Sequence, residues 1–275
     1  MTRQRISILI LAAIALVAAS CTTSPTGRKQ IIWQSDAELA IESARAFADM
    51  SASLPLVTDR EIIDYVACVA NAVVAVLDPP YSEYDWEMRI FDEDQVNAFA
   101  MPGGKIGVYK GILKAAQNQD QLAAVIGHEI AHVTARHSNE RASRALMTGV
   151  GTEVAAVILG GGHYGATYTA QAALNEGARF GILLPFNRKQ ESEADIVGLE
   201  YMARAGFDPR AAVPLWQNMA AQHDDAPAEF MSTHPSSERR IEQLITLWPE
   251  ALPLYNEAVE QGRRANCIAP EIEWE

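Results

Sequence analysis

The sequence predicts an α+β fold that is mostly helical, with a small β-sheet or hairpin edge beside one central helix. Three observations support this prediction. Helical patterns lie on both sides of residues 86–109, strand patterns fill that stretch itself, and hydrophobic residues make up 49% of the 275 residues. A chain of this length and composition suffices for one large domain with a sizeable core.

Residues 1–20 are expected to be an export signal of the lipoprotein type. Two arginines precede an apolar run that is too short for a comfortable membrane span. The sequence "VAASC" resembles a lipobox, which predicts that Cys21 becomes the lipidated first residue of the mature protein. Ordinary signal cleavage, with Cys21 incidental, is the alternative. Residues 21–35 are polar and are expected to form a tether.

The folded domain is expected over residues 36–250, followed by a C-terminal tail at 251–275. Its first helices are expected near 36–50 and 59–77, the second opened by a capping box from Thr58 to Glu61. "WEMRIF" alternates like a strand, and "VNAFAMPGGKIGVY" is typical of two strands joined by a Pro-Gly-Gly turn. These two stretches supply the predicted sheet.

The second half of the domain is expected to be helical again. The Ala/Gly-rich stretch 145–185 has no apolar span long enough for a membrane helix, and we expect helical segments around a glycine break. Asp208 followed by Pro209 is typical of a helix start. The other helices are expected from Gln119, over 188–205, and after His234-Pro235.

Charge and cysteine content narrow the partners and the compartment. The formal net charge of −13 would repel a polyanion, so no nucleic-acid partner is expected. Apart from Cys21, the chain contains Cys68 and Cys267. In an exported protein two such thiols tend to pair, and we expect a disulfide between them. Two buried, unpaired thiols are the alternative.

The stretch "VIGHEIAHVTARH" contains the chemistry. His128 and His132 are four residues apart, so on a helix both imidazoles face one point. A catalytic zinc ion takes three protein ligands and an open position for water, and Glu129 is placed to take a proton from that water. The H-E-x-x-H pattern thus predicts one Zn²⁺ per chain and Glu129 as the catalytic base. His137 lies half a helical turn from the metal face and is not expected to be a ligand.

The third ligand is expected from "NRKQESEADIVG" at 187–198. Glu191 and Asp195 are four residues apart and share a helix face, whereas Glu193 points the opposite way. We expect Glu191 to bind zinc and Asp195 to accept an N–H from a ligating histidine. A charged, solvated helix face is the ordinary alternative for such a run.

Four ordered motifs resemble the gluzincin zinc metalloendopeptidases of the HtpX, CAAX prenyl protease, BepA and LoiP type. They are HEIAH at 128–132, "ESEAD" at 191–195, "NAFAMPGGKIGVYKGIL" at 97–113 and "THPSSERRI" at 233–241. The resemblance covers about residues 60–247 and is strongest to the exported, periplasmic branch. It implies a gluzincin peptidase core, with His128, His132 and Glu191 as ligands and Glu129 as acid/base.

The resemblance also implies roles for two residues near the C-terminus. His234 would occupy the water position as a gating ligand, which makes the enzyme latent until the segment moves; a packing histidine is the alternative. Arg240 would help to stabilise the oxyanion of the reaction.

Two functions from different classes are consistent with these motifs. The first is a zinc metalloendopeptidase that cleaves misfolded or misassembled envelope proteins on the periplasmic side of a bacterial membrane, as an outer-membrane lipoprotein anchored through its lipid. The second is a zinc-stabilised assembly factor or chaperone with little proteolysis. Glu129 favours the enzyme, because a binding module has no use for a base beside the metal.

Overall fold

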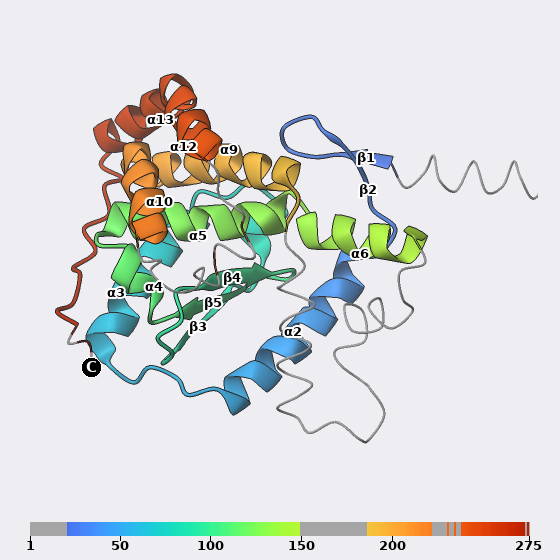
Figure 1. The fold of residues 1–275 in the computed structure, drawn as a ribbon, viewed down its shortest axis with the longest axis horizontal. Helices are drawn as coiled ribbons and strands as arrows, with labels where there is room; N and C mark the ends of the chain where they lie inside the picture. The colour runs from blue at the N-terminus through green and yellow to red at the C-terminus, as the bar shows by residue number, and fades with distance from the viewer. Residues whose placement is uncertain are drawn as a thin grey trace, which may run out of the picture.

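A computed structural model describes residues 21–148, 186–221, 230, 234, 238–272 and 274 of the chain. The α+β prediction is confirmed: helices dominate and surround a small sheet (Figure 1). The strands are β1 (Cys21–Thr23), β2 (Lys29–Ile31), β3 (Glu87–Phe91), β4 (Ala98–Met101) and β5 (Lys105–Tyr109). The longer helices are α2 (Asp36–Ser53), α3 (Arg60–Val74), α5 (Gln119–Thr134), α6 (His137–Thr148), α9 (Arg188–Arg204), α10 (Ala212–Ala221), α12 (Glu238–Thr246) and α13 (Trp248–Glu260).

Helix α5 is the centre of the fold. The sheet lies along one side of it and α9 runs along the opposite side (Figure 1). Every residue from Gln121 to Thr134 is buried, because α3 and α10 also pack against α5. A helix covered on all sides is usually apolar all round. The buried His128, Glu129 and His132 of α5 therefore require polar partners, because a buried polar group without one costs free energy.

The three-stranded sheet has the order β3-β5-β4. β4 and β5 form the antiparallel hairpin that the Pro-Gly-Gly turn predicts, with Gly103 and Gly104 at positive φ. β3 pairs in parallel with β5, which places it on the far side of the hairpin from β4. β4 is consequently an edge strand, and it is the strand that contacts α5.

The C-terminal part of the chain covers the end of α9. Helix α13 packs on α9, and α12 bridges α10, α13 and α9. The chain then returns to α3, where the structure joins Cys267 and Cys68 in a disulfide with a Cα–Cα distance of 5.7 Å. Helix α13 runs across residue 250, where the sequence suggests the end of the domain.

Residues 21–31, within the expected tether, form a β-hairpin, which we call the N-terminal hairpin. β1 and β2 pair antiparallel around a turn with Gly27 at φ 83°. This hairpin lies next to α6 and the start of α9 (Figure 1). Its strands are short and polar, so sequence periodicity does not reveal it.

Two other details differ from the sequence prediction or lie beyond it. The N-cap of α3 is Asp59, which accepts from the amides of Glu61 and Ile62, and not Thr58. Aspartate is the stronger cap because its carboxylate also interacts favourably with the helix dipole.

Most of the Ala/Gly-rich stretch 145–185 lies outside the described residues, as does the signal at 1–20. Among the helices that the structure does describe, none combines the length and apolarity of a membrane span.

Candidate metal centre

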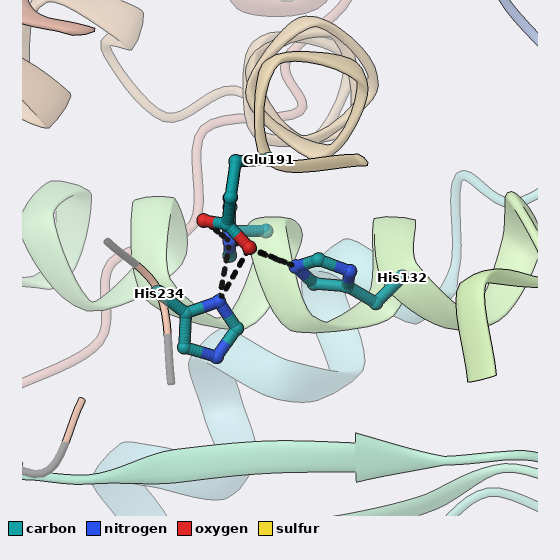
Figure 2. A group of neighbouring side chains, drawn as sticks. His132, Glu191 and His234 are labelled. Carbon is teal, nitrogen blue, oxygen red and sulfur yellow. Dashed lines mark hydrogen bonds and ion pairs between the residues drawn. The ribbon is translucent and has the colours of Figure 1, made fainter. Parts of the chain in front are cut away.

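Four side chains from three segments converge beside α5. His128 and His132 extend from α5, Glu191 extends from the first turn of α9, and His234 comes from the segment before α12. Figure 2 shows His132, Glu191 and His234 pointing toward one another. One potential ligand atom from each of the four lies within 4.8 Å of all the others, and each residue is at least 96% buried.

The spacing of these atoms fits a tetrahedral zinc ion. The Nε2 atoms of His128 and His132 are 3.0 Å apart, and His128 Nε2 is 3.2 Å from His234 Nδ1. Glu191 oxygens lie 3.5 Å from each of the two α5 imidazoles. Ligand bonds of about 2.0–2.2 Å around a tetrahedral ion separate the ligand atoms by roughly 3.3–3.6 Å. The donor set, three imidazoles and one carboxylate, is also one that zinc prefers.

Arg240 of α12 holds Glu191 in place. Its Nη1 donates to Glu191 Oε2 at 2.7 Å, while its Nε and Nη2 donate to Asp195 at 2.7 and 2.8 Å. The guanidinium also stacks on Trp216, 3.7 Å from the ring centroid. Burial alone would raise the pKa of Glu191, but His234 and Arg240 hold that pKa well below its ordinary value. Glu191 is therefore an ionised carboxylate, as a metal ligand must be.

Asp195 orients His128. Its Oδ1 is 3.1 Å from His128 Nδ1, and because an ionised carboxylate only accepts, His128 donates from Nδ1 and leaves Nε2 free for a metal. Burial would lower the pKa of His128, yet the hydrogen bonds with Asp195 and Glu191 raise it to about 9. The surrounding carboxylates thus favour a positive charge on His128, and a metal cation at Nε2 would supply that charge in place of the proton.

His132 has a different partner, His137. The Nδ1 atoms of the two rings are 2.8 Å apart, and His137 Nε2 is 3.1 Å from Glu193 Oε2. His137 is not among the four converging residues but lies directly behind one of them. Burial lowers the pKa values of both His132 and His137, which keeps these imidazoles neutral.

Glu129 lies beside the converging ligands. It accepts a hydrogen bond from the main-chain N–H of Ala100 in β4, and its Oε1 is 3.4 Å from His234 Nε2. Burial is the main cause of its raised pKa. A carboxylate with a raised pKa at this position is suited to taking up a proton and returning it.

His234 lies between Glu191 and Glu129. Its Nδ1 is 3.1 Å from Glu191 Oε1, and its ring stacks on Phe230 and Phe186 with centroid distances of 4.4 and 5.2 Å. One ring nitrogen thus faces the metal ligands and the other faces Glu129. A substrate carbonyl would need the volume that this ring fills.

The sequence identifies most of these residues but not all. The structure brings together His128, Glu129, His132, Glu191 and His234, and it places Asp195 and Arg240 directly behind them. Arg240 donates to two carboxylates, and its support of the oxyanion stays a prediction. Sequence reasoning missed the roles of His137 and Glu193, because it continued α5 as a helix through His137.

His137 does not lie where a continuous helix would place it, because the helix breaks just before this residue. Helix α5 ends at Thr134, and Arg136 adopts φ 58°, a conformation that a non-glycine residue rarely takes. The break turns the chain so that His137 begins α6 and faces back toward His132. The signal in the sequence is Glu193, a further carboxylate on a helix that also carries the apolar residues Ala194, Ile196, Val197 and Leu199.

This fold and site define a gluzincin-type metallopeptidase core, with an H-E-x-x-H helix completed by a glutamate from a second helix. The model of Peptidase family M48 matches residues 63–247, and the chain belongs to that family.

Similar proteins come from two groups. The chain is 42% identical over 191 residues to the mitochondrial metalloendopeptidase OMA1 of Schizosaccharomyces pombe, which covers 68% of this chain and 53% of that protein. It is 31% identical over 216 residues to the beta-barrel assembly-enhancing protease of Yersinia pestis, which covers 74% of this chain and 44% of the relative. The chain thus spans about half the length of these relatives, or less.

Proposed function

We propose that this protein is a zinc-dependent endopeptidase that binds one Zn²⁺ through His128, His132 and Glu191. The observation that carries the proposal is the position of Glu129 beside the four converging residues, with its Oε1 3.4 Å from His234 Nε2. Among the residues that the structure describes, no Arg or Lys forms a salt bridge with this buried carboxylate. A zinc ion held only for stability needs no such group, and a buried carboxylate without a paired Arg or Lys costs folding free energy.

The reaction requires a base, an acid and a polarised carbonyl. Zinc, when bound, supplies an acidified water and polarises the scissile carbonyl. Glu129 takes the proton of the attacking water and delivers it to the departing amine. Asp195 and Arg240 keep His128 and Glu191 aimed at the ion, so the ligands do not reorganise during the reaction.

The substrate class follows from the position of β4. The Ala100 N–H that contacts Glu129 belongs to β4, which is an edge strand among the strands that the structure describes, so this edge of the sheet lies at the proposed catalytic base. An extended peptide can add to such an edge through main-chain hydrogen bonds, which give affinity with little side-chain selectivity. Unfolded or misassembled proteins offer extended segments, and we infer that they are the substrates.

The location we propose is the periplasmic side of the outer membrane, with Cys21 carrying a lipid anchor. The lipobox-like "VAASC" supports this location, as does the Cys68–Cys267 disulfide, which is typical of an oxidising compartment. Envelope quality control is consistent with the likeness to the beta-barrel assembly-enhancing protease. A Cys21→Ser protein should leave the membrane fraction, whereas one that stays there with wild-type protein would contradict the anchor.

The decisive test compares wild type with Glu129→Gln on an unfolded protein such as casein. Glu129→Gln should keep one zinc per chain, measured by elemental analysis, and lose about 10²–10⁴-fold in cleavage rate, the usual effect of removing a general base. Equal cleavage by both proteins would refute the role of Glu129. Zinc binding without cleavage, even after His234 is replaced by alanine, would favour the assembly-factor function.

A further inference from the structure

The N-terminal hairpin, residues 21–31, is connected to the metal centre by a continuous path of hydrogen bonds. Thr26 Oγ1 donates to Glu193 Oε1 at 2.6 Å and Arg28 Nε donates to Glu193 Oε2 at 2.9 Å. Glu193 accepts from His137 Nε2 at 3.1 Å, and His137 Nδ1 is 2.8 Å from His132 Nδ1. The path therefore runs from the hairpin through Glu193 and His137 to a metal ligand.

The hairpin is fixed to this path by a second carboxylate. Arg28 donates through Nη1 and Nη2 to the fully buried Glu140 of α6, at 2.8 and 2.7 Å. Arg28 thus joins Glu140 of α6 to Glu193 of α9 through one guanidinium. Bidentate pairs of this kind are geometrically specific. Loss of Arg28 removes the arginine partner of the buried Glu193, whereas Glu140 keeps Arg144 at 2.6 Å.

The path determines which nitrogen of His132 carries the hydrogen. Glu193 is an ionised carboxylate that only accepts, so His137 donates from Nε2. The neutral His137 ring then accepts at Nδ1, and the hydrogen between the two rings belongs to His132 Nδ1. His132 Nε2 is left with its lone pair directed at the convergence point, 3.0 Å from His128 Nε2. Asp195 likewise accepts from His128 Nδ1, which leaves the Nε2 of that ring free. Asp195 itself accepts from Arg240 of α12.

We propose that the N-terminal hairpin is part of the metal centre: Thr26 and Arg28 act as positioning residues that hold Glu193 and His137, and through them fix the tautomer and orientation of His132. The hairpin precedes residues 63–247, the part of the chain that the family model matches. This inference rests on the proposed zinc site.

The test measures how fast the full-length protein releases zinc to an excess of a chromophoric chelator. His137→Phe should speed release about 10-fold, the lower end of the effect of removing a ligand's partner. Arg28→Ala and Thr26→Val should speed release about threefold, since they act one step farther away. Thr26→Ser keeps the hydroxyl and should behave as wild type. The control is Lys29→Ala, on the same hairpin, whose Nζ donates to the exposed Thr23 side chain.

A double variant separates positioning from general loosening. If the hairpin acts through His137, Arg28→Ala should add no further increase in a protein that already carries His137→Phe. Thermal unfolding of the metal-free proteins checks that the hairpin variants fold. If Arg28→Ala and Thr26→Val both release zinc at the wild-type rate, the inference is wrong. It is also wrong if Arg28→Ala speeds release equally in the wild-type protein and in His137→Phe. Neither result affects the proposed function. A wild-type protein that binds no zinc would overturn the inference together with the proposed function.

Discussion

Gly127 of α5 and Gly198 of α9 meet backbone to backbone, and Gly127 immediately precedes His128, a proposed metal ligand. A Cβ on Gly127 would lie 2.8 Å from the Gly198 carbonyl oxygen, and a Cβ on Gly198 would lie 2.8 Å from the His128 nitrogen. Contacts this short do not occur between real side chains and backbone. The absence of both side chains lets the two helices approach closely enough for Glu191 and Asp195 to reach the α5 histidines.

This contact predicts that Gly198→Ala separates α5 from α9. The added methyl group should cost about 1–3 kcal/mol of folding free energy, the usual effect of overpacking a tight contact. It should also weaken zinc binding, because Glu191 and Asp195 move with α9. Chemical denaturation and zinc titration measure the two effects. Glu200→Ala, at an exposed position of α9, is the control and should change neither quantity by much.

His234→Ala should increase cleavage of casein. The ring of His234 lies between the metal ligands and Glu129, with Nδ1 3.1 Å from Glu191 and Nε2 3.4 Å from Glu129. Its removal opens the position that water and the substrate carbonyl need, while the three remaining ligands still suffice for a catalytic zinc site. Initial rates at equal zinc loading measure the effect.

The opposite result has a clear meaning. Cleavage that falls in His234→Ala would show that His234 supports the reaction itself, and the gating role would have to be abandoned. Phe186→Leu is a suitable companion variant, because it removes a stacking partner of His234 without removing the imidazole.

Glu140 makes the stability of the protein dependent on pH. Burial would raise its pKa, but hydrogen bonds from Arg28 and Gln190 lower the pKa below the ordinary value of 4.5. A carboxylate with a lowered pKa in the folded state stabilises the protein above its unfolded pKa, and this contribution is lost as the pH falls through the folded value. Glu140→Gln should therefore be less stable than wild type at pH 7, by about 1–3 kcal/mol.

The difference between the two proteins should narrow as the pH falls below about 4.5, where Glu140 becomes protonated in the unfolded chain, and it should be lost as the pH falls through the lower pKa of the folded state. Unfolding midpoints measured in urea between pH 7 and pH 3.5 would show this. A difference that stays constant over the range would mean that the charge of Glu140 contributes nothing. Asp94→Asn removes a fully exposed partner of Lys114 and serves as a surface control.

The features that the sequence predicts are those that depend on local spacing. A separation of four residues fixes a shared helix face, so the spacing alone pairs His128 with His132, and Glu191 with Asp195. The β4–β5 hairpin is equally local, because its Pro-Gly-Gly turn determines the pairing. The disulfide partners follow from cysteine number and the expected compartment, and the structure joins the same two residues.

The features that could not be predicted from the sequence depend on contacts between residues far apart in the chain, or on an interruption of a helix. The N-terminal hairpin docks through Arg28, whose partners lie 112 and 165 residues away and leave no periodic trace in the sequence. The role of His137 requires the break at Arg136, where steric preference opposes the observed φ. The parallel pairing of β3 with β5 likewise joins two strands that β4 separates in the sequence, so no local turn predicts it.

The bond between Cys68 and Cys267 encloses the ligands and Glu129 in one covalent ring of the chain. A peptide bond cut anywhere inside that ring, by another copy of the enzyme or by a different protease, leaves the two pieces attached. On a gel run without reductant such a nicked molecule keeps its full mass. Self-cleavage of this protein would therefore become visible only when the sample is reduced.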